Sequence, residues 1–461
     1  MNDAGGWASE AWRLVLVAAA SLAILLLAEA ARRSGRVSPE GGRKLTHFGV
    51  GVLAGAFPWI FASPVTVAVL TVASLAGLLV ARRVRALPAL YDVGRTTAGE
   101  LYFPIAVAVL FALARHQPVF YLISIYTLVV CDAVAAILGK SYGRHSFLVT
   151  TDRKTLEGTA AFLVATFLGV ELPLVLLTGL DRAACVLIAV QVALLVTSFE
   201  AISVRGIDNL VVPLGTFYLL VRMTSRSAES VGHALLVQLA ILGVMLLLAW
   251  RTRFLTFSGA LAAHLVLYAC YALGSPRWIF APAAALAAFL VLDAYAHRGP
   301  DPSRPAYHVA AIFHMSLTAM LFVFADNALA SPLASARRSF GHPFYSLFVG
   351  ALAASLAAGT YLALRTGPRV IRHRRGLRVA IALLVGFLVV VPAGLALERD
   401  SLRLLDVASA GLLCALSVAG FLILHRRGGE AVEPTAQLRY VSTATIVAAC
   451  IVVPIYLMSL R

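Results

Sequence analysis

Two cations, Arg153 and Lys154, and two carboxylates, Asp152 and Glu157, lie close together in the segment TTDRKTLEG. Thr151 or Asp152 can cap a helix that begins with RKTLEGTAAF. Arg153 and Lys154 then lie in its first turn, where free backbone N–H groups and the helix dipole favour an anion. Glu157 follows Lys154 by three residues, so it can orient a cation or hold a divalent metal that bridges phosphates. The segment therefore predicts a polyphosphate site; the alternative is a set of basic anchoring residues with a local ion pair.

A further carboxylate, Asp132, lies within the apolar run IYTLVVCDAVAAILGK. Ionisable groups at membrane depth are costly and usually mark a functional site. On a helix, Asp132 and Lys140 share one face, so both can point into a polar cavity; the alternative is an ion pair between helices. Gly139 and Gly143 bracket the sequence KSY. Small residues let backbone amides approach a phosphate, although glycine also commonly ends a helix.

Other polar side chains lie where apolar runs begin or end. His47 follows Arg43 and Lys44, and it is either an interfacial residue or a base within reach of a hydroxyl group. Several carboxyl and amide groups can each cap a helix, or together can supply a metal site and one base. These are Glu100, Glu200, Asp208 and Asn209.

The elements that must position these residues are apolar helices. The chain has 461 residues, of which 61% are hydrophobic and 13% charged, and its mean hydropathy is +0.89. Apolar runs of about 20 residues, long enough to cross a bilayer, recur along the whole chain. We therefore expect an all-α fold, a polytopic integral membrane bundle of about sixteen helices. The expected spans are roughly 11–31, 47–62, 64–81, 100–114, 118–138, 158–178, 183–203, 207–224, 232–250, 255–272, 278–295, 306–326, 343–364, 378–396, 403–424 and 440–459.

The net charge of +16 comes from basic residues in short connections. They gather after the first, third, fifth, ninth and thirteenth expected spans, a bias typical of cytoplasmic loops rather than of nucleic-acid binding. We expect an integral, multi-pass protein of a bacterial inner (plasma) membrane, with its N-terminus outside. Four segments rich in polar residues then face the cytoplasm together: 29–47, 91–104, 131–158 and 199–209.

Five segments, in order and spacing, resemble the polyprenol kinase family of membrane enzymes, which includes dolichol kinase, phytol kinase and a CTP-dependent diacylglycerol kinase. They are RKLTH (43–47), GELYFP (99–104), DAVAAILGKSYG (132–143), KTLEG (154–158) and EAISVRGIDNLVVP (200–213). The resemblance covers about residues 29–225. It implies phosphorylation of a lipid alcohol by CTP, with Mg²⁺ as the divalent metal and the nucleotide on the cytoplasmic side.

The resemblance also implies roles for individual residues. Those expected to be catalytic are Asp132, Lys154, Glu157 and His47. Those expected to bind the nucleotide are Gly139, Lys140, Gly143, Arg153, Lys154, Thr155 and Gly158. The expected metal ligands are Asp132, Glu157 and Asp208, and the other motif positions are Arg43, Lys44, Arg95, Glu100, Glu200, Asp208 and Asn209.

The chain is expected to divide into an N-terminal helix (1–31), a kinase-like domain (32–225) and a C-terminal multi-helix domain (226–461). The last domain contains no second KTLEG segment. The sequence FADNALASPLASARRSFGHP faintly resembles the region around Asp132, with Asp326 in the equivalent place, which suggests a degenerate second module. Small residues at helix interfaces would produce much of the same pattern.

Two other functions stay open. A cytidylyltransferase that forms a CDP-lipid also needs CTP, a metal and a membrane site, although its usual glycine- and histidine-rich segment is absent. A lipid transporter would explain the many spans but not the polar clusters on one side. The alcohol also stays open, since phytol, geranylgeraniol, longer polyprenols and diacylglycerol all carry a hydroxyl on an apolar tail.

Overall fold

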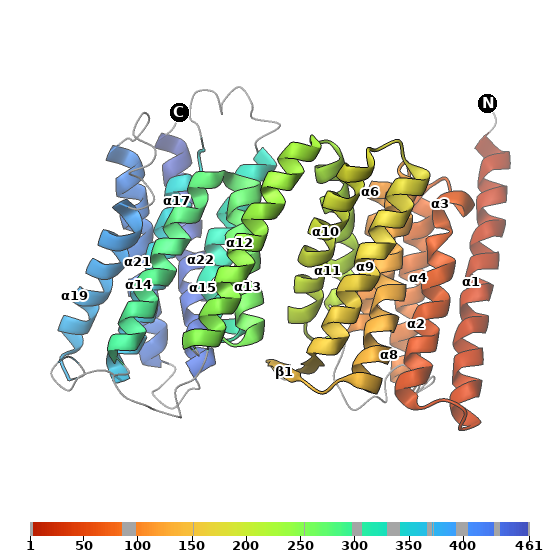
Figure 1. Cartoon of the computed structure of the whole chain (residues 1–461), viewed down its shortest axis with the longest axis horizontal. Helices are drawn as coiled ribbons and strands as arrows, with labels where there is room; N and C mark the ends of the chain where they lie inside the picture. Colours follow the sequence, from red (N-terminus) through yellow and green to blue (C-terminus); the bar gives the residue numbers. More distant parts are fainter. Residues whose placement is uncertain are drawn as a thin grey trace. The chain divides into compact units, whose positions relative to one another are not determined.

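A computed structural model of the chain describes residues 3–84, 98–150, 152–252, 254–296, 307–329, 342–366, 371, 373–392, 404–427 and 434–459. The fold divides into two compact units, unit 1 (Met1–Leu236) and unit 2 (Val237–Arg461). Among the described residues, nearly all regular structure is helical (Figure 1). The chain is therefore a polytopic helical membrane protein, as its composition predicts.

Unit 1 is a bundle of helices with one short antiparallel strand pair. Its helices are α1 (Asp3–Arg33), α2 (Pro39–Gly55), α3 (Phe57–Ile60), α4 (Pro64–Arg83), α6 (Gly99–Ala114), α7 (Pro118–Tyr126), α8 (Asp132–Tyr142), α9 (Leu156–Leu177), α10 (Arg182–Ile202) and α11 (Asp208–Thr224), followed by α12 (Ala228–Thr252), which continues into unit 2. A π-helical turn, Thr127–Cys131, joins α7 to α8. Strands β1 (Ser146–Val149) and β2 (Asp152–Thr155) lie between α8 and α9.

Unit 2 is also helical. It contains α13 (Phe257–Ala269), α14 (Phe280–Ala296), α15 (Val309–Leu329), α17 (Tyr345–Thr366), α19 (Arg375–Val385), α21 (Leu404–Arg427) and α22 (Pro434–Ser459). The central helix of this unit is α17, because almost all its side chains are buried among the apolar residues of the neighbouring helices.

The expectation of about sixteen membrane-spanning helices is not met in the part of the chain that the structure describes. Twelve helices there are long and apolar enough to cross a membrane. The expected spans 47–62, 100–114, 207–224 and 378–396 correspond to α2, α6, α11 and α19, which have 17, 16, 17 and 11 residues. Helix α19 continues as a π-helical stretch, Gly386–Val390. Seventeen residues rise only about 26 Å, less than a hydrocarbon core of ~30 Å. Three of these short helices, α2, α6 and α11, begin with predicted site residues.

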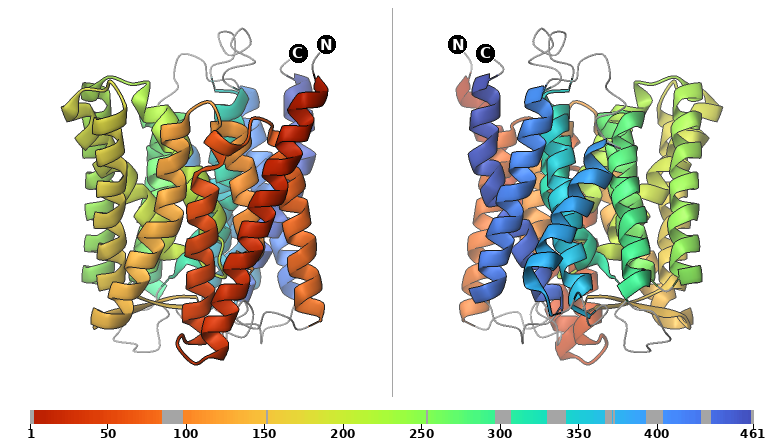
Figure 2. Two further views of the ribbon diagram at one scale, coloured as in Figure 1. Left: turned by 90° about the vertical axis from the view of Figure 1, so that its right-hand side faces the viewer. Right: turned by 90° about the vertical axis from the view of Figure 1, so that its left-hand side faces the viewer.

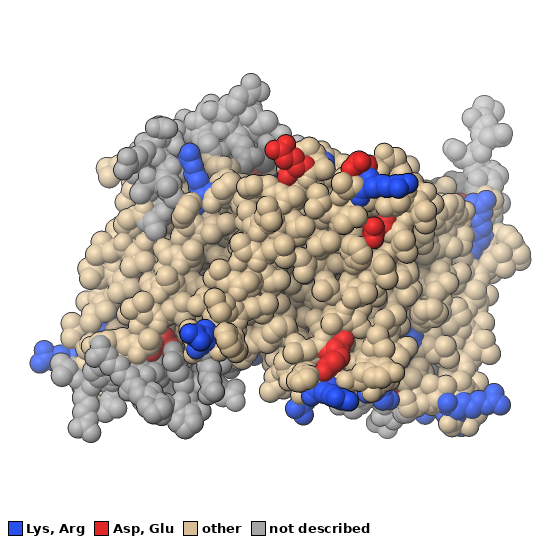
Figure 3. Space-filling model, viewed as in Figure 1, with Lys and Arg blue, Asp and Glu red and all other residues tan. Residues whose placement is uncertain are grey.

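Apolar side chains cover much of the outside of each unit. On the face drawn in Figure 3, Lys, Arg, Asp and Glu lie near helix ends, and the middle of the helices is uncharged. Large hydrophobic side chains such as Leu27, Leu176 and Trp250 are well exposed. Such a surface suits a lipid surrounding, in which every backbone polar group must be bonded within the helices.

The helices of unit 1 alternate in direction, so their polar ends gather. In Figures 1 and 2, the end of α1, the start of α2 and the strand pair lie at the same, lower end of this unit. Ser38 caps α2 by accepting a hydrogen bond from the Gly41 amide at 3.1 Å. Thr155 caps α9 in the same way, whereas α6, α8 and α11 begin without a side-chain cap.

Candidate active site

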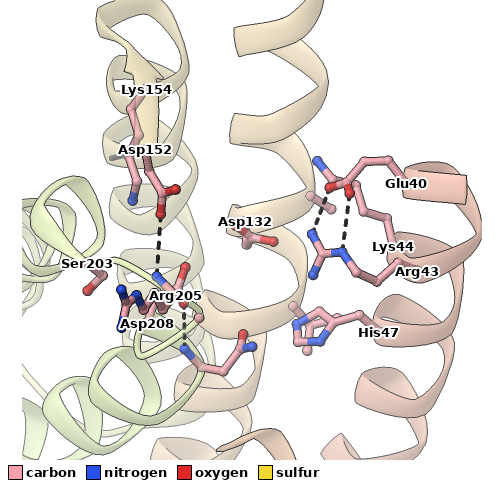
Figure 4. Close-up of a pocket in the computed structure, with 14 residues that line it drawn as sticks. Glu40, Arg43, Lys44, His47, Asp132, Asp152, Lys154, Ser203, Arg205 and Asp208 are labelled. Carbon is pink, nitrogen blue, oxygen red and sulfur yellow. Dashed lines mark hydrogen bonds and ion pairs between the residues drawn. The ribbon is translucent and has the colours of Figure 1, made fainter. Parts of the chain in front are cut away.

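A polar cavity of about 130 Å³ lies at this end of unit 1. Figure 4 shows side chains of α2 on one side, the segment between α10 and α11 on the other, and Asp132 between them. The cavity is lined by Glu40, Arg43, Lys44, His47, Val129, Asp132, Ala133, Asp152, Lys154, Ser203, Arg205, Gly206, Asp208 and Asn209. The structure thus brings together residues from four of the five sequence segments.

Three carboxylates lie within ligand distance of one another. One oxygen from each of Asp132, Glu200 and Asp208 lies within 4.8 Å of the others. Carboxylate oxygens are the ligands that hard divalent cations such as Mg²⁺ prefer, and like charges this close need a compensating cation. The donor set therefore fits a divalent metal. It includes two of the three ligands expected from the sequence, Asp132 and Asp208, and Glu200 lies with them in place of Glu157.

Lys154 forms an ion pair with one of these carboxylates. Its Nζ lies 2.8 Å from Oε1 of Glu200 and also donates to the Glu200 backbone oxygen. Burial alone would lower the pKa of the Lys154 ammonium, but the surrounding carboxylates, Glu200 above all, outweigh this effect and raise that pKa above its usual value. Lys154 is therefore a fixed positive charge at neutral pH.

The local fold around Lys154 differs from the predicted one. The helix expected to begin at Arg153 begins at Leu156, because Thr155 caps it by accepting a bond from the Gly158 amide at 3.1 Å. Residues 152–155 form β2, so successive side chains point to opposite faces. Lys154 faces the cavity, whereas Arg153 is exposed and donates to Ser146 Oγ at 3.0 Å.

Glu157 does not line the cavity. Its Oε1 lies 2.8 Å from Nδ1 of His145, and both carboxylate oxygens accept from the His145 backbone amide. These hydrogen bonds connect His145, the residue before β1, to the first turn of α9. The structure does not bring Glu157 to Asp132 and Asp208.

The glycines of the predicted nucleotide site lie between packed helices. A Cβ added to Gly139 would lie 2.8 Å from Thr155 Oγ1, and one added to Gly158 would lie 3.0 Å from the Ala135 oxygen. Gly143 is similarly crowded by Thr155. These small residues let α8 approach α9 closely, and Lys140 is exposed outside the cavity.

The basic side of the cavity comes from α2. Arg43 pairs with Glu40 at 2.8 Å, and Lys44 and His47 lie beside it. The His47 ring packs edge-on against Phe103, with ring centroids 4.9 Å apart. No partner for His47 Nε2 occurs among the described residues, although this atom is buried. A buried, unpaired nitrogen facing a polar cavity is suited to meet a hydroxyl group.

Two other positions predicted from the sequence are not among the described residues that line the polar cavity. Glu100 lies outside the polar cavity, with Oε1 3.9 Å from Nη1 of Arg82. Arg95 lies outside the described residues.

Three polar lining residues, Glu40, Ser203 and Arg205, were not singled out from the sequence, and Asp152 was expected only as a helix cap. Arg205 and Gly206 take left-handed φ angles of 56° and 83°, which turn the chain sharply between α10 and α11. The Arg205 amide then donates to Asp152 Oδ2 at 3.4 Å, which links this turn to β2. The dipeptide Arg-Gly just before Asp208 was the available signal for such a turn.

Comparison with known proteins supports the family resemblance that the five segments indicate. Over 209 residues the chain is 33% identical to the phytol kinase of Synechocystis sp., an alignment that covers 44% of this chain and 89% of that protein. No protein-family model and no solved structure matches the chain. Given this degree and extent of identity, the chain belongs to the phytol kinase-like family of polyprenol kinases.

Proposed function

We propose that the chain is a membrane lipid-alcohol kinase, which transfers the terminal phosphate of a nucleoside triphosphate to an alcohol with a long apolar tail. The observation that carries the proposal is the convergence of Asp132, Glu200 and Asp208 around the fixed charge of Lys154. The similarity to a phytol kinase supports the same chemistry. Catalysis of phosphoryl transfer consists mainly of positioning and charge stabilisation, which a cavity with this composition supplies.

The three carboxylates would hold Mg²⁺, which when bound neutralises and aligns phosphate oxygens. Lys154 would stabilise negative charge on the phosphates from the side of β2. Arg43 and Lys44 would do so from the side of α2, across the same cavity. These cations would bind the nucleotide and would stabilise the negative charge that develops during transfer.

In the transfer step, the alcohol oxygen attacks the terminal phosphorus as the bond from that phosphorus to the bridging β-phosphate oxygen breaks. The products are a phosphate monoester and a nucleoside diphosphate. The hydroxyl proton passes to Asp132 or to His47, both of which line the cavity.

We further propose that CTP is the donor and that the cavity faces the cytoplasm. The first proposal is supported by the motif resemblance. The second is supported by the basic residues at this end of unit 1. Arg32 and Arg33 lie in the last turn of α1, Arg36 follows it, and Arg43 and Lys44 lie near the start of α2.

The test uses the purified full chain in lipid nanodiscs with Mg²⁺ and CTP labelled at either its α- or its γ-phosphate. The acceptors are phytol, geranylgeraniol, a long polyprenol and diacylglycerol. Label from the γ-phosphate in a lipid product is the expected result. Incorporation of the α-label would show a cytidylyltransferase instead, and no labelled lipid with CTP or ATP would overturn the proposal in favour of transport.

A further inference from the structure

A second, larger cavity adjoins the polar one. It has a volume of about 580 Å³ and lies among α1, α2, α4 and α6 of unit 1. Its lining is mostly apolar and small, with Ala18, Ala73 and Gly77 among its members. This volume falls within the range of about 300–1,000 Å³ typical of small-ligand sites.

The two cavities meet at three residues. Arg43, His47 and Asn209 line both of them. At this junction Thr46 Oγ1 and His47 Nε2 are buried, and neither has a hydrogen-bond partner among the described residues. Buried polar atoms without partners are costly, so their position at the mouth of an apolar cavity points to a ligand with a single polar head.

The depth of the apolar cavity matches one membrane leaflet. Its lining on α2 runs from Arg43 to Ala54, a rise of about 16 Å at about 1.5 Å per residue. Half of a hydrocarbon core of ~30 Å is about 15 Å. The cavity therefore suits an apolar tail that extends through one leaflet.

The far end of the cavity is formed by Phe57. This side chain is only 5% exposed and packs edge-on against Phe61, with ring centroids 5.2 Å apart. It begins α3, which Figure 1 shows at the end of unit 1 opposite to the start of α2. A tail longer than the cavity would therefore meet the Phe57 ring.

The side of the cavity is open between α1 and α4. Leu22 on α1 and Val80 on α4 both line it, yet they are 53% and 61% exposed. A Cβ added to Gly77 in the middle of α4 would meet no atom within 4 Å. An amphiphile can thus enter sideways from the bilayer without leaving its leaflet.

We infer that this cavity holds the tail of the alcohol substrate, with the hydroxyl at His47 and Thr46, and that Phe57 limits the length of tail accepted. The inference rests on the proposed kinase function. It favours alcohols whose tails reach about the depth of one leaflet over much longer polyprenols.

Binding is tested first, without any need for activity. Geranylgeraniol that carries a diazirine at its far end is photolysed with the full chain in nanodiscs, and labelled peptides are identified by mass spectrometry. Label on the segments around Phe57 and Leu70 is the expected result. Label spread over lipid-facing helices, with none at these segments, would overturn the inference even if the protein proves to be a kinase.

Activity is tested next with matched variants. Gly77→Phe places a ring in the cavity and should raise KM for geranylgeraniol at least about tenfold, the loss expected when about two methylene groups can no longer be buried. Phosphorylation of geraniol, whose tail is shorter, should change far less. Gly243→Phe is the control, since Gly243 on α12 is equally open and lines neither cavity.

Phe57→Ala should extend activity to longer polyprenols, and Phe111→Ala, which removes a fully buried phenylalanine of α6 that lines neither cavity, should not. If the wild type phosphorylates alcohols but all four variants keep its chain-length profile, the tail site is wrong and the kinase proposal stands. If the wild type phosphorylates no alcohol, the kinase proposal fails, and the labelling result alone decides the tail site.

Discussion

At the scale of single residues, the site depends on which way each side chain points. Lys154 and Arg153 are neighbours in a strand, so one faces the carboxylates and the other faces outward. From the sequence both seemed equally able to bind phosphate, because a helical first turn was expected there. The residue types were predictable, but their division between cavity and surface required the strand.

Replacing Lys154 should therefore affect transfer far more than replacing its neighbour. Lys154→Ala should lower the rate of phosphoryl transfer by about 10²–10³-fold, the typical loss of one preorganised group that stabilises developing charge. Arg153→Ala should stay near the wild-type rate. Initial rates per mole of folded protein check both variants, and equal losses would show that the strand does not separate the two cations.

The choice of metal ligands gives a second prediction. Asp208→Asn removes one of three clustered carboxylates, so it should raise the Mg²⁺ concentration needed for half-maximal activity. Glu157→Gln should leave that concentration unchanged, because Glu157 binds His145 instead. Mg²⁺ titrations of both variants distinguish the two carboxylates. A shift for both variants would restore the ligand set expected from the sequence, and no shift for Asp208→Asn would contradict the carboxylate cluster.

At the scale of elements, close packing of α8 on α9 brings Asp132 and the strand that carries Lys154 to the same cavity. Gly139 and Gly158 meet where these helices are nearest, with Thr155 between them. The sequence indicated a glycine-rich segment suited to phosphates. Which atoms these glycines approach depends on the pairing of two helices, and local sequence does not specify such a pairing.

Gly139→Ala should destabilise unit 1 by about 1–3 kcal/mol, as overpacking commonly does, because the new Cβ meets Thr155 and Gly158. The control is Gly215→Ala on α11, where no atom lies within 4 Å of the added Cβ. There the better helix propensity of alanine should leave stability unchanged or raise it by up to about 1 kcal/mol. Thermal unfolding in detergent compares the two. A Gly139→Ala protein as stable as the wild type would contradict the packing described.

The lengths of individual helices explain why fewer membrane-spanning helices are found than the sequence predicted. Apolar runs identify most of the helices correctly, since their length and composition are local properties. The shorter helices α2, α6 and α11 begin with polar residues, and hydropathy alone does not distinguish them from full spans.

At the scale of the whole molecule, the basic connections predict which side of the membrane the cavity faces. In a Cys450→Ala background, which removes the cysteine that is exposed among the described residues, a single cysteine is introduced at Arg36 or at His116. An impermeant maleimide added to intact cells should label His116→Cys and spare Arg36→Cys until the cells are opened. The reverse pattern would place the cavity outside the cell.

The two units should differ in chemistry. Among the described residues, unit 2 has no group of three metal-ligating side chains comparable to that of unit 1. Its Asp326 is 2% exposed and pairs with His342 at 2.8 Å, which is a sufficient structural role for a buried carboxylate. The weak sequence likeness between the regions of Asp326 and Asp132 therefore does not require a second catalytic site.

The most direct measurement compares Asp132→Asn with Asp326→Asn. Both changes are nearly isosteric and remove one carboxylate charge, one in each unit. Transfer of labelled γ-phosphate from CTP to a lipid alcohol is measured per mole of folded protein. Asp132→Asn should lose about 10²-fold or more in rate, and Asp326→Asn should keep the wild-type rate. Full activity of Asp132→Asn, or equal inactivity of the two variants, would contradict a single catalytic site in unit 1.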